Sequence, residues 1–215
     1  MVRLYLDVET YRGREEDAFV NERVIAIGVI EDWIRYSSES LSSGEERVQF
    51  KYFIEWDLKS EEGVIKEFYG YLEVLRKGSD FLVVVGFNIL RFDIPLLIQK
   101  SVEYGKDLAE VNKLWHSTFA IDLFQVALPL NGMTFKGHSL ENLARLLRER
   151  GFGVPEPVGS GADVAKWYEE NKHDEIINHL KGDLDVVRTI DLTMMSRFHK
   201  YEELRERMLN IIQNP

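Results

Sequence analysis

The feature that most restricts the fold is an uninterrupted apolar run at residues 81–86, followed directly by a polar loop. A strand without alternating polar residues is typical of a position buried on both faces of a sheet. Residues 94–104, which follow the loop, show helical spacing, and Pro95 is acceptable in a first helical turn. A buried strand, a loop and a helix in this order favour an α/β fold.

The rest of the chain supplies further elements of such a fold. Apolar, β-branched and aromatic residues dominate the predicted strands, which are residues 2–8, 23–31, 47–55, 81–86 and 119–123. Helical spacing of apolar residues gives the predicted helices, which are residues 61–77, 94–104, the segment from Ser139 to Gly151, and most of 162–215. The sequence therefore predicts a mixed five-stranded sheet flanked by helices, in one domain spanning residues 1–215.

Composition excludes several classes of protein. The chain has no cysteine, which rules out a disulfide framework, a thiolate zinc site and a cysteine nucleophile. Its 45% hydrophobic and 30% charged residues are typical of a soluble globular protein. The first residues lack the apolar core of a signal peptide, and no apolar run approaches the roughly 18 residues of a membrane helix. We therefore expect a cytoplasmic protein without a membrane partner.

The charge balance limits the kind of nucleic-acid contact that is plausible. Lys and Arg number 27 against 37 Asp and Glu, giving a net charge of −10. A broad, non-specific duplex binder neutralises phosphates with a surplus of basic residues, so that class is disfavoured. The charge is uneven, because residues 86–150 contain 8 basic and 7 acidic side chains. The balance still allows a local nucleic-acid site.

Asp7 and Glu9 form the first candidate site, at the end of the first predicted strand. Alternate residues of a strand point to the same face, so the two carboxylates converge. Two carboxylates held together repel each other, and a divalent cation most readily offsets this cost. Taken alone, the pair is better explained as exposed acids at a strand terminus, which are common.

Two further groups of polar residues follow. Asn88 and Asp93 lie in the loop after the buried strand, at the position where α/β sheets usually hold ligands. Asp93 also fits a helix N-cap beside Pro95. His179 and Asp183, four residues apart on a predicted helix, share one face and could reach the same metal or water. An exposed ion pair on a surface helix is the alternative, although the apolar neighbours of Asp183 favour a half-buried acid.

In order and spacing, three strings resemble the exonuclease motifs of the DEDD superfamily of 3′–5′ exonucleases, the DnaQ-like group with the ribonuclease H fold. They are LDVET (6–10), GFNILRFDIPLL (86–97) and HLKGDLDVV (179–187). The middle string is the most specific and is similar to the second motif of the proofreading domain of family B DNA polymerases. The resemblance covers roughly residues 2–195 and implies a ribonuclease H-like fold.

The resemblance also assigns roles to residues. It implies two Mg²⁺ or Mn²⁺ ions held by four metal-binding and catalytic carboxylates, which are Asp7, Glu9, Asp93 and Asp183. His179 would orient or deprotonate the attacking water. It stands where the family B-like branch has Tyr, four residues before the last acid, whereas the other branch has His five residues before it. Asp185, with Thr189 four residues later, is an alternative fourth acid, although it would put Lys181 in the Tyr position. Asp183 is preferred because the apolar residues Leu184, Val186, Val187 and Ile190 then take the buried positions of the helix.

The implied activity is metal-dependent 3′–5′ exonucleolytic hydrolysis of single-stranded or frayed DNA, with RNA as a further candidate substrate, releasing nucleoside 5′-monophosphates. Asn88 and Phe92 match positions that line the 3′-terminal nucleotide, although Phe92 equally fits a core residue. Thr10 could offer its backbone N–H to the terminal sugar. The expected partner is a nucleic-acid 3′ end, and no protein partner is indicated. Two alternatives stay open: a catalytically impaired module that binds nucleic acid or a protein, and an endonuclease with the same fold.

Overall fold

The computed structural model describes residues 1–13, 21–33 and 48–213, with side chains described as far as residue 196. Its strands form one sheet and are β1 (Val2–Tyr11), β2 (Arg23–Trp33), β3 (Val48–Ile54), β4 (Leu82–Gly86) and β5 (Phe119–Asp122). The strand order is β3-β2-β1-β4-β5. Strand β2 is antiparallel to β1 and β3, whereas β4 is parallel to β1 and β5. The predicted α/β fold with a mixed five-stranded sheet is confirmed, and it is compatible with a ribonuclease H-like fold.

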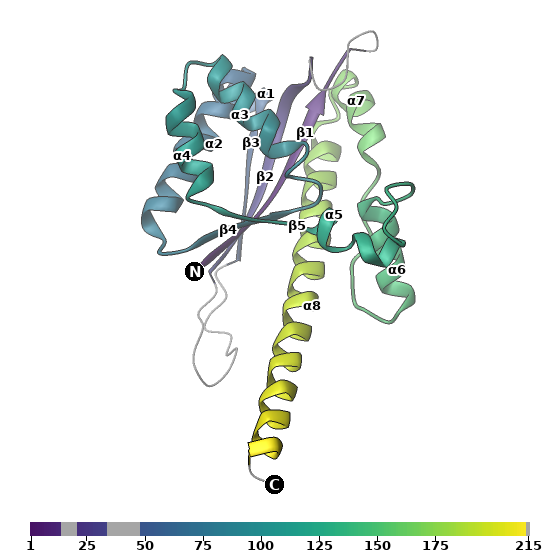
Figure 1. Ribbon diagram of the computed structural model, residues 1–215. Coiled ribbons are helices and arrows are strands. Elements are labelled where there is room, and N and C mark those ends of the chain that lie inside the picture. Colours follow the sequence, from purple (N-terminus) through teal and green to yellow (C-terminus); the bar gives the residue numbers. More distant parts are fainter. Residues whose placement is uncertain (14–20, 34–47, 214–215) are drawn as a thin grey trace.

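Helices flank the sheet on both faces, as predicted. They are α1 (Glu55–Leu58), α2 (Glu61–Gly78), α3 (Asp93–Glu103), α4 (Leu108–His116), α5 (Leu123–Val126), α6 (Leu140–Glu149), α7 (Gly161–Glu169) and α8 (His173–Gln213), with a 3₁₀ turn, η1, at Leu128–Asn131. Helices α2, α3 and α4 lie on one side of the sheet, and α6, α7 and α8 lie on the other (Figure 1). Within the described ranges, none of these helices is both long and apolar enough to cross a membrane.

Most predicted elements are present, and the differences are local. Helices α1, α4 and α5 and the turn η1 were not predicted. The elements α1, α5 and η1 are each four residues long, and α4 buries only Val111 and Trp115. The continuous helix predicted from residue 162 is two helices. Asn171, with a φ of 54°, lies between α7 and α8. This left-handed conformation is one that Asn tolerates better than most residues and that ends a helix.

The central strand β1 divides its side chains between two hydrophobic cores. Leu4, Leu6 and Val8 join the core that α2 and α3 cover, whereas Tyr5 joins the core that α8 covers. Successive strand residues point to opposite faces. Asp7 and Glu9 therefore point in the same direction as Tyr5, toward α8.

Helix α8 approaches the sheet closely where β2 carries Gly28, the register partner of Asp7. A Cβ atom at Gly28 would lie 2.6 Å from Cγ of Leu180 and 2.8 Å from Cδ1 of Leu184. Both leucines are fully buried. The missing side chain at Gly28 thus sets the distance between α8 and the strand that carries the acids.

One buried and one partly buried ion pair fix the same helix further along. The Arg3 guanidinium donates to Asp191 over 2.6 Å, and the Tyr5 hydroxyl donates to the same Oδ2 atom over 3.0 Å. Arg188 donates to Asp32 of β2 over 2.9 Å. Charged groups that are paired in this way hold a helix in one register, because shifting it would leave a buried charge without a partner.

The contact at Gly28 gives a test of how α8 is positioned. We expect Gly28→Ala to lower the free energy of unfolding by about 1–3 kcal/mol, because the new methyl group overpacks against Leu180 and Leu184. Gly70→Ala is the matched control, since a Cβ at this helical position in α2 meets nothing within 4 Å. It should stabilise the fold by about 0.5–1 kcal/mol. Urea denaturation of both variants measures this, and an unchanged midpoint for Gly28→Ala would contradict the proposed close contact.

Candidate four-carboxylate site

Gly86, the last residue of β4, and Asn88 shape the turn from β4 into α3. A Cβ at Gly86 would lie 2.7 Å from the carbonyl oxygen of Leu6, so only glycine allows the chain to leave β4 this close to β1. Asn88 has a φ of 65°, and its carbonyl oxygen accepts hydrogen bonds of 3.1 Å from the N–H groups of Arg91 and Phe92. Asn is one of the few residues that adopt this left-handed conformation readily. The turn brings the start of α3 beside β1.

Asp122, at the end of β5, holds this loop from the other side. Its carboxylate accepts hydrogen bonds from the N–H groups of Asn88 (2.8 Å), Leu90 (3.2 Å) and Phe124 (3.0 Å). Asp122 lies in the strand predicted at residues 119–123, but the sequence analysis did not predict that it anchors the loop. Only the β4–β5 pairing, which sets Gly86 opposite Asp122, reveals it.

The structure directs the four predicted carboxylates to one region between β1, α3 and α8. Glu9 and Asp93 are buried, and the side chain of Asp183 is 16% exposed. Asp93 is the first residue of α3 and Phe92 is the N-cap, so the interpretation of Asp93 as the cap was wrong. The buried helix face turns Asp183 inward, whereas Asp185 is exposed.

His179 links two of these acids. Its side chain is 2% exposed, and Nε2 lies 3.4 Å from Oε1 of Glu9 and 3.9 Å from Oδ2 of Asp183. Its Nδ1 lies 2.5 Å from the carbonyl oxygen of Val158. A carbonyl oxygen can only accept, so Nδ1 carries the hydrogen and Nε2 is the nitrogen that can take up another proton.

The loop that holds His179 is the Gly- and Pro-rich stretch at 151–163. Val158 packs on Gly182, where a Cβ would lie 3.0 Å from a Val158 methyl carbon. The ring of Trp167, in α7, meets the His179 ring edge-on, with centroids 5.8 Å apart. Sequence reasoning missed both Val158 and Trp167. Gly182, inside the third motif, was the available signal for a close approach at this point.

Burial and mutual repulsion shape the electrostatics of the site. Burial, with the charge of Asp183 next in importance, raises the pKa of Asp7 to about 7, and nearby His179 acts in the opposite direction. The pKa of Asp183 also rises to about 7, through burial and then the charge of Glu141 in α6. Burial raises the pKa values of Glu9 and Asp93 well above their ordinary range, and in both cases the charge of Asp7 adds to the effect.

These acids fit a cation-binding role in charge and chemistry. Among the described residues, the buried Oδ1 atoms of Asp93, Asp183 and Asn88 have no hydrogen-bond partner. Hard divalent cations prefer oxygen ligands of this kind, and a nearby cation would lower the pKa values that burial has raised. As the side chains stand, no three His, Asp or Glu side chains among the described residues form a group that could hold a metal. The predicted pair of Mg²⁺ or Mn²⁺ ions therefore stays a prediction.

The predicted substrate contacts lie at the edges of this region. Thr10 follows Glu9 at an irregularity in the pairing of β1 with β2, and its side chain is half-buried. Asn88 and Phe92 are in the loop before Asp93, and Phe92 packs partly against the core under α3. Their predicted contact with a nucleotide stays a prediction.

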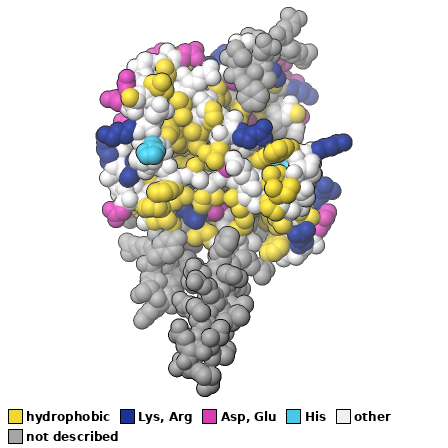
Figure 2. Space-filling model, viewed as in Figure 1, with side chains coloured by type: hydrophobic (Ala, Val, Ile, Leu, Met, Phe, Trp, Pro, Cys, Tyr) yellow, Lys and Arg dark blue, Asp and Glu magenta, His cyan; other side chains and the backbone are white. Residues whose placement is uncertain are grey.

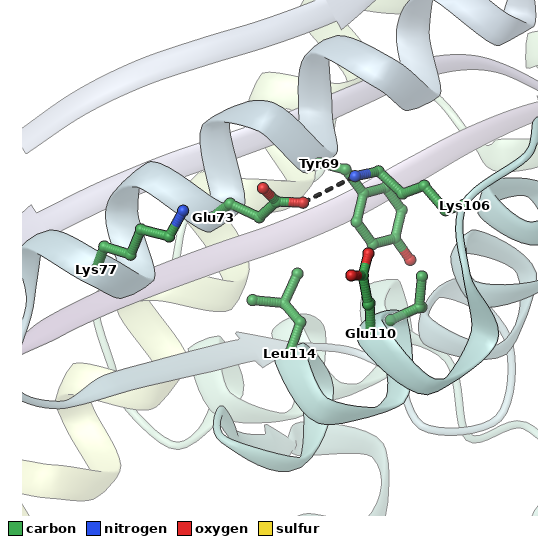
Figure 3. Close-up of a pocket in the computed structure, with 7 residues that line it drawn as sticks. Tyr69, Glu73, Lys77, Lys106, Glu110 and Leu114 are labelled. Carbon is green, nitrogen blue, oxygen red and sulfur yellow. Dashed lines mark hydrogen bonds and ion pairs between the residues drawn. The ribbon is translucent and has the colours of Figure 1, made fainter.

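A separate cavity lies on the opposite side of the sheet, between α2 and α4. It has a volume of about 230 Å³ and is lined mainly by charged side chains around Tyr69 (Figure 3). Lys106 pairs with Glu73 over 2.7 Å and lies 5.3 Å from the centre of the Tyr69 ring. Lys77 and Glu110 also line the cavity, which therefore has two positively and two negatively charged side chains. This balanced cavity adds no residue to the four-carboxylate site.

Comparison with known proteins identifies the architecture. No protein-family model matches the chain, and no curated protein sequence compared with it is a match. A solved structure of the family B DNA polymerase from the hyperthermophilic archaeon Pyrobaculum calidifontis is similar in fold, with a TM-score of 0.63 and 17% identity over 90% of this chain. The chain spans 24% of the length of that polymerase. At this level of identity, the similarity shows the fold alone.

The raised pKa values predict how stability depends on pH. A carboxyl group whose pKa is raised in the fold favours folding while it is protonated, so metal-free protein should lose stability as pH rises from about 4 to 7. Asp183→Asn should weaken this loss, because it removes one of the repelling charges. The exposed control Asp185→Asn should not. Thermal unfolding in a chelator between pH 5 and 8 measures the effect, and identical profiles for the two variants would contradict the assignment.

Adding metal should reverse the loss. At pH 8 and a hundredfold excess over the dissociation constant, we expect Mn²⁺ to raise the melting temperature of the wild type by about 5–10 °C. Asp183→Asn should reduce this shift, while Asp185→Asn should retain it. An equal Mn²⁺ shift in Asp183→Asn and wild type would show that the metal binds elsewhere.

Proposed function

We propose that this protein is a metal-dependent 3′–5′ exonuclease that removes nucleoside 5′-monophosphates from single-stranded or frayed DNA, with RNA as a second candidate substrate. The observation that carries the proposal is that Asp7, Glu9 and Asp183 interact with one buried histidine, His179, while Asp93 interacts with Asp7. The similarity of the fold to that of a family B DNA polymerase supports it. The three sequence motifs fall on the elements that form the site.

The four carboxylates would hold two Mg²⁺ or Mn²⁺ ions. Such a pair lowers the pKa of a water molecule and stabilises the oxyanion that leaves when a phosphodiester is displaced in line. The unpartnered oxygens of Asp93 and Asp183 are the protein atoms best suited to this role. All-oxygen ligation favours Mg²⁺ and Mn²⁺ over softer metals.

His179 is proposed to manage the proton of the attacking water. Val158 holds the hydrogen on Nδ1, so Nε2 is available as the base, and Trp167 limits rotation of the ring. The water oxygen forms a bond to the terminal phosphorus, its proton passes to Nε2, and the bond from phosphorus to the 3′ oxygen of the preceding nucleotide breaks. The leaving 3′ oxygen then takes up a proton to become a hydroxyl group. A histidine suits this task because its unperturbed pKa of about 6.5 is close to working pH.

The terminal nucleotide is proposed to lie against the loop before α3. The buried amide oxygen of Asn88 has no partner among the described residues, and it could accept a hydrogen bond from the terminal sugar or base. The exposed part of the Phe92 ring could stack on an unpaired base. Thr10 offers its backbone N–H at the point where β1 stops pairing regularly with β2.

The direct test is digestion of a 5′-labelled single-stranded oligonucleotide with Mg²⁺ or Mn²⁺. We expect products that shorten stepwise from the 3′ end, and no products from the Asp7→Ala/Glu9→Ala double variant, because it removes two of the four acids. Asp185→Asn is the matched control and should digest at the wild-type rate. Duplex DNA and RNA of the same sequence, digested in parallel, measure the substrate preference.

Three outcomes of this assay would contradict the proposal. Internal cuts would indicate endonuclease chemistry, and complete absence of digestion by the wild type would indicate a binding module. Equal digestion by the double variant would show that the acids are misassigned.

His179 gives a separate prediction. His179→Ala should lower kcat by about 10²–10⁴, the usual contribution of a general base. The thermal shift caused by Mn²⁺ should remain, because the four carboxylates are intact. Single-turnover digestion together with thermal unfolding measures both effects. A variant that loses the Mn²⁺ shift as well would show that His179 supports the metal site and does not act on water alone.

A further inference from the structure

Beside the loop that starts α3, two phenylalanines and an arginine form a layered surface, here called the aromatic shelf (Arg91, Phe124, Phe135). The rings of Phe124 and Phe135 are nearly parallel, at 8°, with centroids 5.8 Å apart. The Arg91 guanidinium lies 5.6 Å from the centre of the first ring and 5.3 Å from that of the second. Phe124 is buried and Phe135 is 62% exposed, so Phe135 forms the outer layer.

The shelf has a rigid base. Ring nitrogen Nε2 of His138 donates to the carbonyl oxygen of Phe124 over 2.7 Å, and the two rings are in contact. Asn131 donates to the carbonyl oxygens of Thr134 and Lys136, which closes the segment that carries Phe135. These bonds hold the backbone on both sides of Phe135, whose ring is exposed.

The surface of the shelf is apolar and positively charged. Arg91 and Lys136 are exposed, and neither forms an ion pair with any of the residues that the structure describes. Leu90 and Met133 add exposed apolar surface. Figure 2 shows hydrophobic side chains gathered beside Lys and Arg side chains over α5 and the loop before α6. An exposed apolar patch of this kind marks an interaction surface.

The shelf is tied directly to the four-carboxylate site. The carboxylate of Asp122 binds the N–H of Asn88 and the N–H of Phe124, so the substrate loop and the shelf share one anchor. Arg91 is separated from Asp93 by a single residue. The shelf therefore adjoins the loop that leads to Asp93.

We propose that the aromatic shelf binds the single strand upstream of the 3′-terminal nucleotide, with a base on the exposed face of Phe135 and phosphates beside Arg91 and Lys136. This inference rests on the proposed exonuclease function and extends it to the length of strand that is recognised. Aromatic faces combined with a basic groove are how proteins bind single strands without reading sequence. The shelf lies in residues 86–150, the part of this acidic chain without an acidic surplus.

Binding of oligonucleotides of increasing length tests the shelf. Fluorescein-labelled dT2, dT4, dT6 and dT10 are titrated in Mg²⁺ against Asp7→Asn protein, which prevents digestion, and anisotropy is measured. We expect affinity to rise with length, and Phe135→Ala to weaken dT6 binding about tenfold while leaving dT2 binding unchanged. Arg91→Gln should also reduce the slope of log affinity against log salt by about 0.7, the change expected for one lost phosphate contact on a single strand.

Phe119→Ala is the matched control. Phe119 is 56% exposed and stacks on Phe81 with centroids 4.4 Å apart, but at the opposite ends of β4 and β5 from the site. It should leave affinity unchanged at every length. Two results would overturn the proposal for the shelf. One is equal dT6 affinity of Asp7→Asn protein with and without Phe135→Ala, and the other is an affinity that does not rise with oligonucleotide length.

Failure of the shelf and failure of the exonuclease proposal remain distinguishable, because they have different readouts. If the wild type digests the oligonucleotide but binding does not depend on length, the exonuclease proposal is supported and the proposal for the shelf is wrong. Length-dependent binding that Phe135→Ala abolishes supports the shelf even where no nucleotide is released.

Discussion

Packing of α8 against β1 and β2 is the constraint on which the rest of the site depends. Gly28 leaves no side chain between Leu180 and the strands, so the helix lies close enough for His179 to reach Glu9. Ion pairs at Asp191 and Arg188 keep the helix from sliding. Because a helix moves as one body, these contacts fix the position of Asp183 as well.

The same packing buries acidic side chains, and these acids differ in whether a basic side chain lies beside them. Burial raises the pKa of Asp191 as well, but Arg3 and the Tyr5 hydroxyl both donate to its carboxylate and counteract part of this effect. Glu9 and Asp93 have raised pKa values and, besides His179, no such cationic partner is described near them. A bound cation would offset the repulsion between these buried carboxylates. The proposed metal-dependent function therefore explains why the acids lie together.

The loop between β4 and α3 joins the site to the surface around it. Gly86 allows the close approach to β1, Asn88 makes the turn, and Asp122 binds both the loop and the start of α5. One carboxylate thus orders the residues proposed to hold the terminal nucleotide and the residues proposed to hold the strand behind it.

The sequence by itself determined the local elements and which side chains share a face, because these follow from the periods of strands and helices. It predicted the five strands, the four-residue spacing of His179 and Asp183, and the shared face of Asp7 and Glu9. It did not predict α4, whose buried face is narrow, or the contacts of Val158 and Trp167. The apolar neighbours of Asp183 predicted a half-buried side chain, and the structure confirms this, with Asp185 exposed. Only the tertiary structure brought Asp183 close to Asp7 and Glu9, and it alone raised the pKa values. Burial and the distance between residues far apart in the chain set both outcomes, and neither quantity is encoded in local spacing.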